Sequence, residues 1–235
     1  MDVIEIDDDE SRFEFIEAKP RKIMFCIDTS AEMSEILNPS AKTGARDSNL
    51  YYSSRIETTQ RFLKRYANMN EMIGNDKDEY GMITLTDVAT WWYDFSPNVS
   101  SFNEEIGFLD SQVVEHYDTL ELDIGSLFRT IEHYMDPNSF NHVIVIYGRA
   151  DVMPEGNMQI VKEIRKSPNL TMDLIYLHDS TDSVQKIYDF WASLDSEIRP
   201  GWYYETGTYL GKDKMAKALC ELISHPLQRG EQEML

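Results

Sequence analysis

Apolar residues along the chain gather in short runs that alternate with segments of helical spacing. Continuous apolar runs predict buried strands, and apolar residues recurring every three to four positions predict helices. Strands are expected at residues 22–27, 80–85, 89–95, 142–147, 172–177 and 202–205, and helices at about 56–66, 124–131, 157–166, 183–194 and 212–224. Asp87-Val88 is a turn short enough for an antiparallel pair, whereas helices separate most other strands. We therefore predict an α/β fold with a doubly wound, mostly parallel sheet and one antiparallel edge strand.

The chain of 235 residues is long enough for one ordinary domain, and its 42% hydrophobic content is sufficient for a core. We place this domain at residues 20–224, between an acidic segment at 1–19 and a tail at 225–235. The acidic segment is expected to stay solvated or to become ordered against a partner.

Charge and cysteine content narrow the range of possible functions and compartments. The 42 acidic and 22 basic residues give a net charge of −20, which argues against binding to a phosphate backbone. The N-terminus lacks the basic and apolar parts of a secretory signal, and no run is long enough for a membrane span, so we expect an intracellular protein without membrane contact. The two cysteines, Cys26 and Cys220, lack CxxC spacing, which fits a reducing compartment.

The junction after the first predicted strand is the most informative local pattern. The run 22–27 leads into Asp28-Thr29-Ser30-Ala31-Glu32, and Asp-x-Ser after a strand is similar to the first metal-binding loop of the von Willebrand factor A fold. Metal-binding members carry a second serine at the fifth position, where it completes an oxygen shell for Mg²⁺. Glu32 stands there instead, which indicates a degenerate site. Alternatively, Asp28 and Ser30 cap the following helix.

The other parts of such a metal site are incomplete. Thr119 stands where the fold supplies a threonine, but Tyr147-Gly148-Arg149 replaces Thr-Asp-Gly after the central strand. We therefore expect no metal and no other cofactor. Our hypothesis is that the Arg149 guanidinium takes over the electrostatic role of the ion and pairs with Asp28 or Glu32. The alternative is that Arg149 faces solvent.

No catalytic set emerges from the pattern, so we do not expect an enzyme. The five histidines have neither HxxxH nor HExxH spacing, and Cys26 lies inside a predicted strand, where a thiol is a poor nucleophile.

Aromatic residues suggest candidate interfaces. Alternation predicts Trp91, Tyr93 and Phe95 on one face of a strand, which turns Trp92 outward, and the same reasoning turns Tyr203 outward. Exposed aromatic side chains are enriched at protein interfaces, so Trp92 and Tyr203 are candidate partner-binding residues.

Several segments, in order from about 22 to 229, resemble one family. They are Cys26-Ile27-Asp28-Thr29-Ser30-Ala31-Glu32-Met33-Ser34, Ile146-Tyr147-Gly148-Arg149, Tyr176-Leu177-His178-Asp179, Ser193-Leu194-Asp195 and His225-Pro226-Leu227-Gln228-Arg229. They are similar to the von Willebrand A-like adaptor subunits of the BRISC and BRCA-one-A deubiquitinase complexes. Gly230 departs from that pattern, in which a proline is expected.

The resemblance implies a non-catalytic scaffold in a complex specific for lysine-sixty-three-linked polyubiquitin. It implies binding to a BRE-type subunit built from ubiquitin-conjugating-enzyme-variant (UEV) domains, and through it to a JAMM zinc isopeptidase and an Abraxas-type MPN scaffold. It also implies roles in DNA-damage signalling and mitosis, in nucleus and cytoplasm. The alternatives are a metal-dependent A-type ligand-binding module and a proteasomal ubiquitin receptor, although nothing after Arg229 resembles the ubiquitin-interacting helix of such a receptor.

The segment His225-Pro226-Leu227-Gln228-Arg229 is the predicted handle for the UEV subunit. Pro226 ends the last helix and favours an extended backbone. Pro226 and Leu227 would supply apolar anchors, and Arg229 a charge-assisted bond. The alternative is that Pro226 merely ends the helix and Leu227 packs back onto the core.

Overall fold

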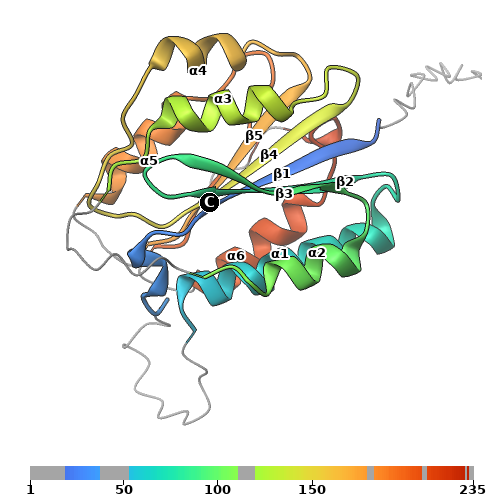
Figure 1. Ribbon diagram of the computed structural model, residues 1–235, viewed down its shortest axis with the longest axis horizontal. Coiled ribbons are helices and arrows are strands. Elements are labelled where there is room, and N and C mark those ends of the chain that lie inside the picture. The colour runs from blue at the N-terminus through green and yellow to red at the C-terminus, as the bar shows by residue number, and fades with distance from the viewer. Residues whose placement is uncertain are drawn as a thin grey trace, which may run out of the picture.

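A computed structural model describes residues 19–37, 53–110, 120–178, 183–207, 211–230 and 232 (Figure 1). The predicted acidic segment lies outside these residues except for Lys19, as does Thr119. Among the described residues, none of the helices combines the length and the apolar character needed to cross a membrane.

The described part of the chain folds around a six-stranded sheet in the order β3-β2-β1-β4-β5-β6. The strands are β1 (Arg21–Asp28), β2 (Glu79–Leu85), β3 (Ala89–Ser96), β4 (Phe140–Tyr147), β5 (Leu170–Tyr176) and β6 (Tyr203–Glu205). All neighbours pair in parallel except β2 and β3. The predicted mostly parallel sheet with one antiparallel edge strand is confirmed.

Helices cover both faces of the sheet (Figure 1). The helices are α1 (Arg55–Ile73), α2 (Val99–Ile106), α3 (Ile124–Tyr134), α4 (Met158–Ile164), α5 (Val184–Ser193) and α6 (Gly211–Leu222), with short 3₁₀ turns η1 (Ala31–Ser34) and η2 (Pro226–Gln228). The α1, α2 and α6 helices pack on one face, and α3, α4 and α5 on the other. Residues of β1 alternate between the two cores, so that Phe25 joins the first and Met24 the second.

The central strands have the apolar character that burial on both faces requires. All residues of β4 and β5 are buried, and β1 is buried apart from one half-exposed position. Local signals set the start of α1, where Ser54 and Glu57 form a reciprocal capping box. Asn98, Asp123 and Asn157 cap α2, α3 and α4 through their side chains.

The edge strand β3 corrects one prediction about its aromatic residues. Its register with β2 shifts twice, because Ile83 pairs with Trp91, Met82 with Tyr93 and Tyr80 with Ser96. Each extra residue in β3 reverses the alternation of side chains. Trp91 therefore stacks on Tyr134 of α3 at 3.7 Å between ring centroids, whereas Tyr93 packs against Phe102 of α2 at 5.7 Å. The prediction that Trp91, Tyr93 and Phe95 share one face is wrong for Tyr93.

Candidate functional site

The candidate site lies at the carboxyl ends of β1 and β4. The strand order reverses direction between these two strands, and in open α/β sheets ligands bind at such a switch point. Asp28 is the last residue of β1, and Gly148 and Arg149 directly follow β4. Parallel pairing of β1 with β4 brings these residues together although they are 120 positions or more apart.

Arg149 fills the switch point with its guanidinium group. Its side chain is 1% exposed, and its Nε and Nη2 each lie 3.2 Å from Oδ1 of the fully buried Asp28. The same guanidinium donates to the carbonyl oxygens of Leu120 at 2.5 Å, Leu85 at 3.1 Å, and Thr86. The predicted pairing of Arg149 with Asp28 is confirmed, and the alternative of a solvent-facing Arg149 is wrong.

The other acceptor positions of Asp28 are also used within the chain. Its Oδ2 accepts the Gly148 amide at 3.0 Å, and its Oδ1 accepts the Ser30 amide at 3.0 Å. Ser30 precedes η1 but makes no side-chain cap bond, and its buried hydroxyl has no hydrogen-bond partner among the described residues. Of the capping alternative, only the bond from the Ser30 amide to Asp28 is present. The element that follows, η1, is a single 3₁₀ turn rather than a long helix.

Glu32 pairs with a different arginine from the one we considered. Its Oε2 accepts the Ala150 amide at 2.8 Å and lies 3.6 Å from Nη1 of Arg55. Arg55 is 1% exposed, lies 3.0 Å from a carboxylate oxygen of Glu35, and donates to the Gly148 carbonyl at 2.8 Å. Burial raises the pKa of Glu32 to about 7, despite the opposing effects of the Ala150 amide and Arg55.

Met33 occupies the space that an aspartate after β4 would need. A Cβ atom at Gly148 would lie 2.3 Å from the Met33 sulfur, a separation that real Cβ atoms do not show. Gly148 stands where metal-binding A domains carry their aspartate. The thioether of Met33 and the guanidinium of Arg149 thus replace the second carboxylate and the ion, respectively.

These residues do not fit a divalent cation. Mg²⁺ requires near-octahedral oxygen ligands, whereas the oxygen atoms of Asp28 already accept bonds from a cation and two amides. Within the described ranges, no group of three or more His, Cys, Asp or Glu side chains is arranged to hold a metal ion.

The buried thiol and imidazoles do not form a reactive set. Cys26 is fully buried in β1, and burial raises the pKa of its thiol far above the ordinary range, which suppresses the thiolate. Burial lowers the pKa of His142 and of His225 to about 4, so both are neutral at physiological pH.

The C-terminal segment forms a 3₁₀ turn and not the extended strand that Pro226 suggested. Its N-cap is the buried His225, whose Nδ1 accepts the Leu227 amide at 3.1 Å. The other ring nitrogen, Nε2, lies 3.2 Å from the carbonyl oxygen of Lys19. Pro226 and Leu227 are half-buried, and Gln228 is exposed. The predicted apolar anchors are therefore partly accessible, on a turn that is fixed at the start of β1.

Arg229 points back into the domain and not outward. Its Nη1 lies 2.7 Å from Oδ2 of Asp173 in β5, and its Nη2 donates to the Leu222 carbonyl at 3.0 Å. The guanidinium also stacks over the Trp202 ring, 4.9 Å from its centroid. Arg229 is thus engaged within the domain, and Gln232 bonds to the backbone of Tyr203. His225 and Arg229 thus pack against the domain, although they lie beyond the predicted boundary at 224.

Asp173 and His142 complete this second charged cluster, which the sequence analysis missed. His142 Nε2 lies 2.5 Å from Asp173 Oδ2, and both side chains are fully buried. Arg229 and His142 hold the pKa of Asp173 well below its usual range, although burial acts in the opposite direction. A charged residue within an otherwise apolar strand is the signal that points to such a partner.

The two candidate interface aromatics differ in accessibility. Trp92 lies on the edge strand, is 44% exposed, and donates its indole N–H to Glu105 at 2.6 Å. Tyr203 is half-buried and packs against the core on the α3, α4 and α5 face. Trp92 therefore fits an outward interface residue, whereas Tyr203 contributes mainly to packing.

Comparisons with known proteins agree with the fold and with the resemblance. The chain is 22% identical over 230 residues to "BRISC and BRCA1-A complex member 1" of Xenopus tropicalis, covering 89% of the chain and 67% of that protein. It is 23% identical over 236 residues to the human protein of the same name, covering 89% of the chain and 65% of that protein. No family model matches. The chain thus corresponds to about two-thirds of these distant relatives.

Among solved structures, the crystal structure of the SpRpn10 VWA domain aligns with a TM-score of 0.56. The alignment covers 85% of the chain and 95% of that structure at 12% sequence identity. The fold is a von Willebrand A fold. At this identity the likeness concerns the fold alone.

Proposed function

We propose that the chain is a non-catalytic adaptor subunit of a deubiquitinase complex of the BRISC or BRCA1-A kind. The observation that carries this proposal is the similarity to BRISC and BRCA1-A complex member 1 over 89% of the chain. The segments that resemble the family include both the Asp28 loop and the turn that begins at His225.

The filled switch point supports an adaptor that binds through its outer surface. A metal-dependent A domain presents an open coordination position to a ligand carboxylate. Here Arg149 and Met33 occupy the corresponding space, and Arg149 is already neutralised by Asp28. Recognition at this point would require breaking a buried ion pair, which costs several kcal/mol. Other surfaces are therefore better candidates for partner contacts.

We propose that the main partner of the chain is a BRE-type subunit built from UEV domains. Through that subunit the chain would join a JAMM zinc isopeptidase and an Abraxas-type MPN scaffold, in a complex acting on lysine-sixty-three-linked polyubiquitin in cytoplasm and nucleus. The outer side of the turn formed by Pro226, Leu227 and Gln228 is one candidate contact, and Trp92 on the edge strand is the other.

Copurification tests this proposal directly. A tagged chain, expressed at its natural level in cells of its own organism, is purified and its partners are identified by mass spectrometry. We expect a UEV-domain protein and a JAMM isopeptidase in near-stoichiometric amounts, and metal-chelator-sensitive cleavage of lysine-sixty-three-linked chains in the eluate. The purified single chain is expected to cleave no ubiquitin chain. Recovery of the chain without either partner, or cleavage by the single chain, would overturn the proposal.

A further inference from the structure

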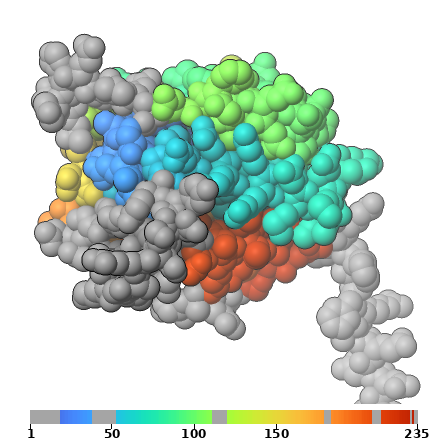
Figure 2. Space-filling model, turned by 90° about the horizontal axis from the view of Figure 1, so that it is seen from below, coloured from blue at the N-terminus to red at the C-terminus, as the bar shows by residue number. Residues whose placement is uncertain are grey.

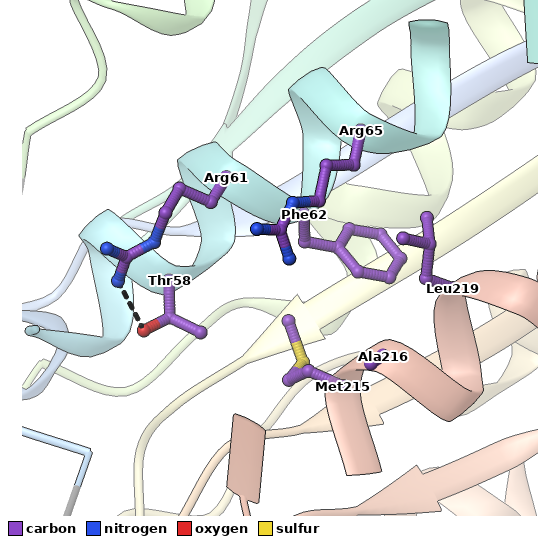
Figure 3. A pocket seen from close by; sticks show the side chains of 7 residues that line it. All are labelled: Thr58, Arg61, Phe62, Arg65, Met215, Ala216 and Leu219. Carbon is purple, nitrogen blue, oxygen red and sulfur yellow. Dashed lines mark hydrogen bonds between the residues drawn. The ribbon is translucent and has the colours of Figure 1, made fainter. Parts of the chain in front are cut away.

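A groove between α1 and α6 combines an apolar floor with two arginine side chains at its rim. Figure 3 shows Phe62 of α1 facing Met215 and Leu219 of α6, with Arg61 and Arg65 extending from α1 beside them. The three apolar side chains are 4–5% exposed, whereas both arginines are exposed. The groove measures about 250 Å³, which is less than typical cofactor sites and suits one or two side chains of a peptide.

The two helices that form the groove are basic in a strongly acidic chain. Together they carry seven basic residues, four in α1 and three in α6, against four acidic residues. The whole chain has a net charge of −20. Figure 2 shows α1 and α6 side by side on one face of the molecule. Such a local reversal of charge attracts an acidic segment.

The arginines at the rim have no acidic partner in the described part of the chain. Among the described residues, the structure shows one polar contact for Arg61, a 3.4 Å hydrogen bond to the Thr58 hydroxyl, and no salt bridge for Arg65. The other arginine of this helix, Arg55, is paired with carboxylates. The charge of the Arg61 and Arg65 pair is therefore available to a ligand.

We propose that the groove binds the acidic N-terminal segment of the same chain, residues 1–18. This segment contains eight Asp or Glu residues and one Arg, and it also carries Val, Ile and Phe residues that match an apolar floor. The segment therefore matches the groove in both charge and apolar character, which identifies it as the occupant.

The segment is joined to the domain at the end of the same groove. Arg21, at the start of β1, bonds to Asn70 near the C-terminal end of α1 and to the carbonyl of Ile223 just after α6. Arg65 precedes Asn70 by five residues in α1, or about 8 Å along the helix. Eighteen residues can span up to about 60 Å. A tethered segment also acts at a millimolar effective concentration, so that weak contacts suffice.

Two further features favour the N-terminal segment as the occupant of the groove. The hollow beside the start of β1 is lined by Glu71 and Asp76, which repel an acidic segment. Residues 38–52 contain one lysine and one arginine against one aspartate, so their composition does not match the basic groove. Of the segments outside the described residues, the N-terminal segment carries the most acidic residues.

A fluorescent peptide of residues 1–18, titrated against the full chain by anisotropy, tests the proposal. The first variant neutralises the segment of the full chain itself (Asp7→Asn, Asp8→Asn, Asp9→Asn and Glu10→Gln), and the second carries Arg61→Glu and Arg65→Glu in addition. We expect the peptide to bind the first variant at least tenfold more tightly than the unaltered chain, whose own segment competes. The second variant should lose this binding, and 0.5 M salt should weaken it.

Matched controls separate the groove from net charge and from folding. Lys162→Glu with Lys166→Glu, on and after α4 on the opposite face of the sheet, changes the net charge equally and should leave peptide binding unchanged. Arg61→Gln with Arg65→Gln should weaken binding without charge reversal, and circular dichroism must match that of the unaltered chain. Equal binding to the unaltered chain and the first variant would overturn the proposal, as would binding that survives in both arginine variants or an absence of binding to the first variant.

Discussion

The guanidinium of Arg229 lies 2.7 Å from the carboxylate of Asp173, although the two residues are 56 positions apart. The contact joins the C-terminal turn to a central strand of the sheet. It also supplies the cation that a fully buried carboxylate requires. Arg229, the last residue of the segment that resembles a partner-binding motif, therefore has a structural function.

Replacing Arg229 by methionine should destabilise the domain. The change keeps much of the side-chain length but leaves Asp173 with the neutral His142 and the Trp202 amide as partners. Removing one partner of a buried ion pair typically costs about 3–5 kcal/mol in the free energy of unfolding. Urea denaturation measures the loss, and Gln228→Met, at an exposed neighbouring position, is the control. A loss no greater than that of the control would show that the contact contributes little.

The Arg149 and Asp28 pair should behave as a coupled unit. Arg149→Met and Asp28→Asn should each reduce the free energy of unfolding by about 3 kcal/mol or more, since each leaves a buried group without its partner. The double variant should lose less than the sum of the two single variants. Urea denaturation of the four proteins gives the coupling energy. Additive losses would contradict a direct interaction.

Divalent cations should not stabilise the protein. A ligand that binds only the native state raises stability by RT ln(1 + [L]/Kd), so a working metal site would shift thermal unfolding at millimolar Mg²⁺ or Mn²⁺. We expect superimposable unfolding curves with each ion and with a chelator. The contrary result is a saturable upward shift that disappears in Asp28→Ala.

Acid should destabilise the protein partly through His142. Burial lowers the pKa of this imidazole from 6.5 to about 4, against the opposing effect of Asp173. Between these values the unfolded chain binds a proton that the native protein does not, so stability falls as the pH drops from about 6.5 to 4. One such group contributes a slope of up to about 1.4 kcal/mol per pH unit. Urea denaturation at several pH values should show a smaller slope in His142→Gln than in the unaltered protein, and equal slopes would contradict this role of His142.

Glu32 should change the pH dependence of stability in the direction opposite to that of His142. Burial raises its pKa from 4.5 to about 7, so the native protein binds the extra proton between these values and the contribution of Glu32 to stability falls as the pH rises. Glu32→Gln should therefore make stability increase more steeply with pH between about 4.5 and 7. A less steep pH dependence would contradict the assigned protonation.

The sequence predicted those features that depend on runs of apolar residues and on strand ends. The apolar run at 142–147 indicated the central strand β4, and parallel strands carry Asp28 and Arg149 to the same edge. Contacts between side chains that are far apart in the sequence were harder to predict. Nothing in the local pattern shows that Met33 lies against Gly148, or that Arg55 at the start of α1 reaches the same site. The bulges in β3 were hidden because its residues fit regular alternation.

The structure changes how the proposed contact of the His225 turn with the UEV subunit must be tested. Truncation after Ser224 would remove Arg229 as well as the candidate anchors, so a loss of binding could reflect a loss of folding. Leu227→Asp alters a half-buried side chain of the turn and leaves the Arg229 contact in place. We expect this variant to keep its circular dichroism spectrum and most of its stability.

In copurification with the UEV subunit, Leu227→Asp should reduce recovery of the partner at least tenfold, because a carboxylate replaces an apolar anchor at the contact. Trp92→Ser provides the matched variant at the edge strand, where the indole is exposed and does not support the core. Loss of the partner in Trp92→Ser alone would indicate that the contact lies on β3. Unchanged recovery with both folded variants would exclude both surfaces as the principal contact, because a central anchor of an interface cannot be charged or truncated without weakening the complex.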